Sequence, residues 1–241
     1  MTKQEMTAIK SNIEEIKARI ERAAIKAGRD PQDITLLAAT KMNNTDRVQA
    51  AIHCGIHFCG ENKVQELLDK YEQNAYEGAD LQFIGTLQTN KVKYLIGKVS
   101  LIQSVGSIHL GQTISKEASK KNIVQDILIE VNIGLEEAKS GLLPQDLFSC
   151  IEELSVLPSL RIRGLMAIPP VADTDSGNTR YFQQMKQLYE ELKDCDYPNV
   201  QADILSMGMT DDFEEAIACG STMIRLGTAI FGRRNYSSGN A

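Results

Sequence analysis

Residues 101–133 of the chain read LIQSVGSIHLGQTISKEASKKNIVQDILIEVNI, and their pattern indicates the fold class. An apolar run at 101–105 leads into a helical pattern at 108–120, and a second apolar run follows at 127–133. Apolar runs without polar alternation are typical of strands that are covered on both faces. A strand, a helix and a second strand in this order form a parallel pair with a right-handed crossover. The stretch therefore predicts one unit of a parallel α/β fold.

The same alternation recurs along the whole chain. Eight apolar runs are expected to be strands: 34–39, 56–59, 81–85, 101–105, 127–133, 162–167, 202–207 and 222–227. The helices expected between them are 46–54, 64–71, 89–96, 108–120, 144–154, 179–192 and 212–219. Eight such units close naturally into a (β/α)8 TIM barrel, which is the predicted fold class. An open doubly wound sheet is the alternative, but no G-x-G-x-x-G motif follows the first run to support it.

An amphipathic helix precedes the first strand. Ile9, Ile13, Ile16 and Ile20 recur at helical spacing, and Pro31 prevents the helix from continuing. No linker interrupts the pattern that follows, so residues 1–241 are expected to form a single domain. Its parts are an N-terminal helix within 1–30, a barrel over about 34–232, a long surface loop at 169–178 and a frayed end after 236.

Composition and charge exclude several classes of function. The 241 residues are 42% hydrophobic and 24% charged with a net charge of −6, so an acidic globular protein is expected and nucleic acid is an unfavourable partner. No apolar run is long enough to span a bilayer, and the charged N-terminus does not resemble a signal peptide. The five cysteines are scattered and form no C-x-x-C pair, which argues against a disulfide framework. A cytoplasmic protein with no membrane contact is the expectation.

Lys41 is the sharpest candidate for chemistry. It follows the first expected strand directly, and barrels carry their functional groups at the carboxyl ends of their strands. Partial desolvation there would favour the neutral amine, which can form a Schiff base with an aldehyde or ketone. An exposed lysine, or one that neutralises a bound anion, is the alternative.

The loops after the last two strands resemble a phosphate site. Small residues at 206–208 and 227–228 offer backbone N–H groups where barrels commonly bind phosphate, although glycines also make simple turns. Arg225 lies inside an apolar run and needs either a barrel carboxylate or a ligand as its partner. A reactive lysine, a phosphate site and an arginine together indicate a phosphorylated aldehyde. Pyridoxal 5'-phosphate (PLP) and the substrate of a Schiff-base sugar-phosphate aldolase both fit.

Two other groups of residues have ready structural explanations. The histidines and cysteines between 53 and 59 alternate between a helix end and a strand, so they are not expected to hold a metal. Cys59 could be reactive at the barrel mouth, but packing is the favoured interpretation. Met166, Met207 and Met209 could form an apolar wall for a ligand ring, or could equally be part of the core.

Ordered motifs across residues 5–236 resemble the pyridoxal-phosphate homeostasis protein family. Any one of the motifs is weak evidence, but their number and order are specific. They are 58–66 (FCGENKVQE), 83–91 (FIGTLQTNK), 131–132 (VN), 137–141 (EAKSG), 164–170 (GLMAIPP), 205–212 (LSMGMTDD), 220–222 (GST), Arg225, Gly227, 231–232 (FG) and Arg234.

The resemblance implies a barrel related to the N-terminal domain of alanine racemase, with PLP linked covalently to Lys41. It also implies that loops 206–208 and 227–228 hold the phosphate, that Arg225 faces the pyridine nitrogen and that Asn62 lies near the cofactor. The chain departs from the family in carrying Thr40 where Ser is common, and Gln82 where His is common. The expected cofactor-binding residues are Lys41, Asn62, Met166, Ser206, Met207, Gly208, Arg225, Gly227 and Thr228.

The resemblance also bears on catalysis. An arginine at the pyridine nitrogen keeps that nitrogen unprotonated and weakens PLP as an electron sink. Racemases take a second acid–base group from a C-terminal domain that is not expected here. The prediction is therefore a monomeric, non-enzymatic carrier or buffer of PLP that exchanges it with PLP-dependent enzymes. The alternatives are a PLP-dependent racemase or decarboxylase, and the aldolase.

Overall fold

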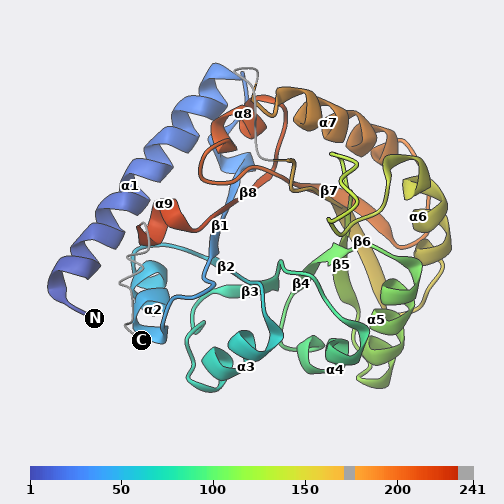
Figure 1. Cartoon of the computed structure of the whole chain (residues 1–241), viewed down its shortest axis with the longest axis horizontal. Helices are drawn as coiled ribbons and strands as arrows, with labels where there is room; N and C mark the ends of the chain where they lie inside the picture. Colours follow the sequence, from blue (N-terminus) through green and yellow to red (C-terminus); the bar gives the residue numbers. More distant parts are fainter. Residues whose placement is uncertain (171–176, 233–241) are drawn as a thin grey trace.

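Eight parallel strands form a closed barrel in a computed structural model that describes residues 1–170 and 177–232 (Figure 1). Neighbours in sequence are neighbours in the barrel, and β1 pairs with β8. The predicted TIM barrel is confirmed. The open sheet is excluded because the first and last strands pair with each other and leave no edge strand. The strands are β1 (Thr35–Ala39), β2 (Phe58–Glu61), β3 (Asp80–Phe83), β4 (Leu101–Val105), β5 (Gln125–Glu130), β6 (Leu160–Met166), β7 (Val200–Ser206) and β8 (Met223–Leu226).

Helices surround the barrel, as Figure 1 shows. All seven helices expected between strands are present, although two of them begin with a separate 3-10 turn. The α-helices are α1 (Lys3–Lys26), α2 (Thr45–His53), α3 (Val64–Glu72), α4 (Val92–Leu95), α5 (Ile108–Lys120), α6 (Leu147–Ser155), α7 (Thr179–Lys193), α8 (Phe213–Ala218) and α9 (Thr228–Phe231). The 3-10 turns are η1 (Pro31–Asp33), η2 (Thr89–Lys91) and η3 (Pro144–Asp146).

The N-terminal helix α1 lies along the outside of the barrel against α2, α8 and α9 (Figure 1). Thr2 and Glu5 form a capping box that satisfies backbone N–H groups in the first turn. The isoleucines that predicted the helix are all buried on its inner face. Burial of this apolar stripe, rather than helix propensity alone, holds α1 in place.

The core has two layers because successive side chains of a strand point to opposite faces. A small inner cluster fills the barrel and includes Leu37, Leu128, Met166 and Met223. A much larger outer cluster lies between the strands and the helices. Burial on both sides explains why the strands are apolar without alternation over most of their length.

Most strand ends differ from the sequence expectation by one to three residues, and two of these differences affect the site. β5 ends at Glu130 because Val131 instead makes an isolated bridge to Leu142 and the Asn132 amide caps the following turn at Glu136. β2 extends to Glu61, which is therefore a buried strand residue rather than a loop residue.

Some sequence predictions fall outside the described residues. The predicted loop 169–178 includes 171–176, and the predicted frayed end and Arg234 lie within 233–241. Among the helices that the structure describes, none is long and apolar enough to cross a membrane.

Gly164 in β6 is expected to be essential for barrel closure. Its φ is +136°, and an added Cβ would lie 1.9 Å from the Ile204 carbonyl oxygen of β7. We expect Gly164→Ala to lower the free energy of unfolding by about 3 kcal/mol or more, measured by urea denaturation. Gly28→Ala is the control, because Gly28 has a φ of +70° with no atom within 4 Å of the added Cβ, and it should cost only about 1 kcal/mol. Equal losses in both variants would contradict the role of the close contact.

Candidate functional site

Barrel closure brings the loops after β1, β7 and β8 together. Ala38 of β1 lies in register with Leu226 of β8, and Ser206 of β7 with Met223 of β8. The contact continues past the strand ends, since a Cβ on Gly227 would lie 3.2 Å from the Ala39 carbonyl oxygen. Lys41 therefore follows a strand that borders the Gly227–Thr228 loop.

The loops after β7 and β8 present free backbone N–H groups. Those of Gly208, Gly227 and Thr228 have no hydrogen-bond partner within the described residues. Gly208 also requires its lack of a side chain, because its φ is +96° and a Cβ would lie 2.6 Å from the Ala216 Cβ. Backbone N–H groups that converge at strand ends can bind an anion without a charged side chain.

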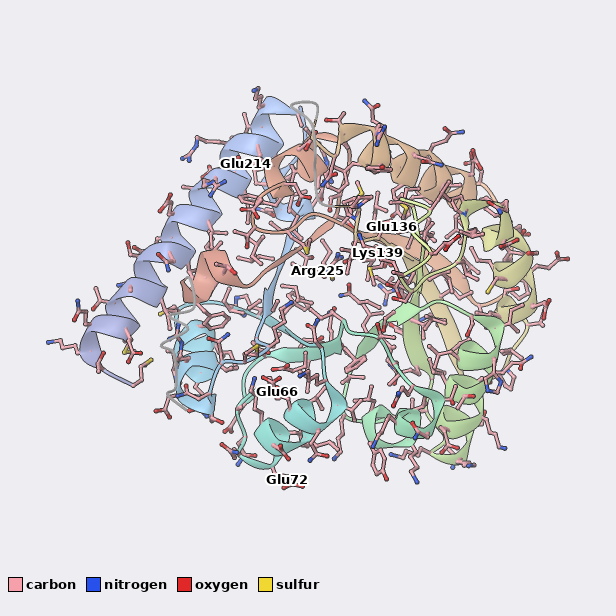
Figure 2. The ribbon with its side chains drawn as sticks, in the orientation of Figure 1. Glu66, Glu72, Glu136, Lys139, Glu214 and Arg225 are labelled. Atoms are coloured by element: carbon pink, nitrogen blue, oxygen red, sulfur yellow. The ribbon has the colours of Figure 1, made fainter. Side chains whose placement is uncertain are left out.

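Arg225 lies inside the ring of strands, as Figure 2 shows, and is 5% exposed. Its Nη1 donates to the Ser206 hydroxyl, and its Nη2 donates to the Ala167 carbonyl oxygen at 2.9 Å. The alternative in which a barrel carboxylate pairs with it directly is wrong for the described residues, among which Arg225 makes no ion pair. Burial lowers the pKa of Arg225 to about 10, while Glu130 and Asp212 act through space in the opposite direction. The guanidinium therefore stays charged at neutral pH with donor capacity to spare.

A buried chain of hydrogen bonds, made by one hydroxyl and two side-chain amides, supports Arg225. The Ser206 hydroxyl donates to Gln103 Oε1 at 2.7 Å, and Gln103 Nε2 donates to Gln82 Oε1 at 2.7 Å. All three side chains are buried inside the barrel. The sequence analysis noted Gln82 only as a departure from the family and did not single out Gln103. Polar residues inside apolar runs are a signal that could have indicated their role. The chain fixes the Ser206 hydroxyl as an acceptor for the arginine.

Lys41 itself is exposed. The desolvation expected from the sequence is therefore not present in this structure. Its backbone is nevertheless well held: Thr40 before it is fully buried, and Asn43 Nδ2 donates to the Lys41 carbonyl oxygen at 3.1 Å. The amine is thus exposed to solvent while the backbone that carries it is held in place.

Asn62 follows β2 at the same end of the barrel. Its Oδ1 is buried and has no hydrogen-bond partner in the described structure. A buried acceptor without a partner is uncommon and indicates a place where a ligand or water donates. The neighbouring backbone is tightly packed, because a Cβ on Gly85 would lie 2.0 Å from the Asn62 carbonyl oxygen.

The three methionines do not form one wall. Met166 packs inside the barrel, whereas Met207 belongs to the outer core and Met209 is 38% exposed. Ser206 and Met207 are successive residues, so their side chains point to opposite faces. Any contact of Met207 with a ligand in the mouth would use its backbone.

Glu130 lines the opposite side of the mouth, beside a cavity of about 760 Å³. Its Oε1 accepts a hydrogen bond from the Ser140 hydroxyl at 2.9 Å, and its Oε2 is buried without a partner. Burial raises the pKa of Glu130, although Ser140 and Arg225 act to lower it. No role of Glu130 was expected from the sequence, because the fifth strand was expected to run on to 133.

The residues present fit PLP. One end of the barrel carries a primary amine, three free N–H groups, a buried arginine with spare donors and an unsatisfied amide oxygen. These groups match an aldehyde, a phosphate and the polar atoms of a pyridine ring. No cluster of three or more potential metal ligands occurs in the described part of the chain.

A closed parallel barrel with a lysine after its first strand and free backbone N–H groups after its last two strands has the architecture of alanine racemase-like barrels. The model of the alanine racemase N-terminal domain matches residues 5–235, and the chain belongs to this family. Within it, a protein of Aquifex aeolicus named pyridoxal phosphate homeostasis protein is 46% identical over 220 residues, covering 90% of this chain and 95% of the relative. A homologue of that name from Haemophilus influenzae is 38% identical and covers 95% of this chain and 98% of its own length. This chain is therefore a member of the pyridoxal phosphate homeostasis proteins.

Among solved structures, PipY of Synechococcus elongatus with PLP bound is similar to this chain. The TM-score is 0.76 at 30% identity, over 89% of this chain and 100% of PipY. A protein of Bifidobacterium adolescentis described as unknown has a TM-score of 0.91 at 33% identity, over 95% of this chain and 97% of its own.

Cys59 is expected to be unreactive. It is fully buried, and burial together with the nearby Glu61 raises the pKa of its thiol to about 12. Treatment of the folded protein with iodoacetamide at pH 8, followed by peptide mapping, should leave Cys59 unlabelled while the half-buried Cys54 and Cys195 react. Because the folded-state pKa lies above the ordinary value of 9.0, the contribution of this thiol to stability is complete below that value and is lost as the pH rises toward 12. Labelling of Cys59 as fast as Cys195 would revive the reactive interpretation.

Proposed function

We propose that this protein binds PLP through Lys41 and acts as a carrier that buffers and releases it. The observation that supports this most directly is the juxtaposition of an exposed amine after β1 with free N–H groups after β7 and β8. The names of its relatives refer to PLP homeostasis, and PipY was solved with PLP bound. The sugar-phosphate aldolase has no comparable support.

In this proposal each part of the mouth binds one part of PLP. The Ser206–Gly208 and Gly227–Thr228 loops hold the phosphate through backbone N–H groups. Arg225 faces the pyridine nitrogen, and the Asn62 Oδ1 is available to accept a hydrogen bond near the ring. Met166 lies beneath as an apolar floor. Lys41 would supply the amine that condenses with the aldehyde, forming a C=N bond while the carbonyl oxygen leaves as water.

The absence of turnover is part of the proposal and is supported by Arg225. PLP supplies an electron sink when its ring nitrogen is protonated. A charged guanidinium without a carboxylate partner donates hydrogen bonds, so it favours an unprotonated nitrogen. An exposed Lys41 also suits a protein that must give its ligand away. The racemase alternative has no comparable support from the geometry.

Three further aspects remain predictions from the sequence. PLP-dependent enzymes are the expected recipients, the protein is expected to act as a monomer, and the cytoplasm is the expected compartment.

Covalent attachment is tested by Lys41→Ala. Wild-type protein incubated with PLP should absorb visible light, and borohydride should leave the mass of reduced PLP on the peptide that contains residue 41. The variant should lose both signals because its side chain has no amine. Lys120→Ala is the control, since this lysine is exposed on α5 outside the barrel. Attachment at residue 41 fails as a hypothesis if the wild-type adduct maps elsewhere.

Turnover is tested with L-alanine. PLP-loaded protein incubated with this amino acid should produce no D-alanine beyond that formed by free PLP, as measured by chiral chromatography. Sustained racemisation that disappears in Lys41→Ala would instead favour the enzyme alternative.

A further inference from the structure

A buried charge cluster lies behind the Lys41 loop, between β2 and α3. The Glu61 side chain is fully buried, and Lys70 is 6% exposed. Lys70 Nζ donates to Glu61 Oε1 at 2.6 Å, to Glu66 Oε1 at 2.7 Å and to the Thr40 carbonyl oxygen at 2.9 Å. The three protons of the ammonium group are matched by three oxygen acceptors.

The cluster holds the peptide groups on both sides of Lys41. On one side, the Thr40 carbonyl accepts from Lys70, and the Thr40 hydroxyl donates to Glu61 Oε1 at 2.7 Å. On the other side, the Met42 N–H donates to Glu66 Oε1. The Lys41 Cα is therefore fixed between two anchored peptide groups while its side chain stays free.

The backbone at Met42 needs such support. Its φ is +61°, in the left-handed region that a residue with a Cβ rarely adopts. A conformation of this kind persists only when its surroundings enforce it, and it is commonly found at functional sites. Here the Glu66 carboxylate enforces it from one side, and the turn bond from the Asn43 N–H to the Thr40 carbonyl at 3.1 Å enforces it from the other.

Stability alone does not explain the charges. Well-packed apolar residues commonly fill such a space at least as stably as a buried ion pair. Apolar residues cannot, however, bind the carbonyl of Thr40 and the N–H of Met42 at the same time. The cluster is thus polar because it binds the two peptide groups that flank Lys41.

We propose that Glu61, Glu66 and Lys70 form a clamp that sets the position of Lys41 for covalent capture of PLP. They are positioning residues, and the inference rests on the proposed function. The phosphate would be held by loops after β7 and β8, on other strands than the clamp. The distance from the Lys41 amine to the aldehyde therefore depends on where the clamp places the Lys41 Cα. Loosening the clamp should weaken the covalent link and leave phosphate and ring binding intact.

Glu66→Ala tests the clamp. The side chain of Glu66 is 22% exposed. When its carboxylate is removed, water can therefore hydrogen-bond to the Met42 N–H and to the Lys70 ammonium, which lose it as a partner. Two ligands separate positioning from general binding: PLP, and pyridoxamine 5'-phosphate, which has the same ring and phosphate but no aldehyde. We expect the affinity for PLP to fall on the order of tenfold, because misplacement of a reacting group by about 1 Å has effects of this size or larger. The affinity for pyridoxamine 5'-phosphate should be unchanged.

Glu72→Ala is the matched control. Glu72 ends the same helix, and Figure 2 shows it on the outer side of α3, whereas Glu66 lies on the side that faces the barrel. This control should bind both ligands as the wild type does. Glu66→Gln keeps the shape of the side chain but removes its charge. It should lower the affinity for PLP by a smaller factor and leave the affinity for pyridoxamine 5'-phosphate unchanged. This variant serves as the test if the alanine variant does not fold.

Two results would overturn the clamp. One is a Glu66 variant that binds PLP as tightly as Glu72→Ala does while the adduct on Lys41 still forms. The other is an equal loss of affinity for both ligands, which would indicate general damage to the mouth. A wild-type protein that leaves no borohydride adduct on Lys41 would instead refute the proposed function, so the two failures are distinguishable.

Discussion

The pairing of β1 with β8 closes the barrel and brings the parts of the proposed site together. Without it, the first and last strands would be opposite edges of an open sheet, and Lys41 would lie far from Gly227. With it, Ala38 and Leu226 are in register, and the amine and the free N–H groups share one mouth. Parallel strands make this possible because all their carboxyl ends lie at the same end of the barrel.

The interior of the barrel shows how a charge can be kept in an apolar core. Arg225 has no ion-pair partner among the described residues, and a chain of neutral groups through Ser206, Gln103 and Gln82 supports it instead. A direct carboxylate partner would occupy the donors of the guanidinium. Neutral partners leave donor capacity for a ligand. Glu130 stabilises the charged guanidinium through space, because it acts to raise the pKa of Arg225. The same arrangement both stabilises the arginine and keeps it available.

The surroundings of Lys41 combine a fixed backbone with an exposed side chain. Burial of Glu61 and Lys70 makes the loop rigid, and exposure of the amine leaves it accessible. A catalytic lysine is commonly desolvated to lower its pKa. The carrier that we propose has a different requirement, since its ligand must leave as readily as it arrives. An accessible amine on a firmly held backbone is consistent with that requirement.

The barrel and the order of its elements could be predicted from the sequence because they follow from local periodicity. The rule that parallel strands end at one face then predicted which loops border the proposed site. Strand ends were correct to within a few residues, and the motifs indicated the family. Other features became apparent in the folded chain alone: the partners of Arg225, the exposure of Lys41, the separation of Met207 from Met166 and the cluster around Glu61. Hydrogen bonds between side chains distant in sequence depend on register and on side-chain direction, and a single sequence encodes these only through the whole fold. For that reason, nothing in the sequence distinguishes Gln103 and Lys70 from other polar residues. In the folded chain, Gln103 supports Ser206 and Lys70 binds the Thr40 carbonyl.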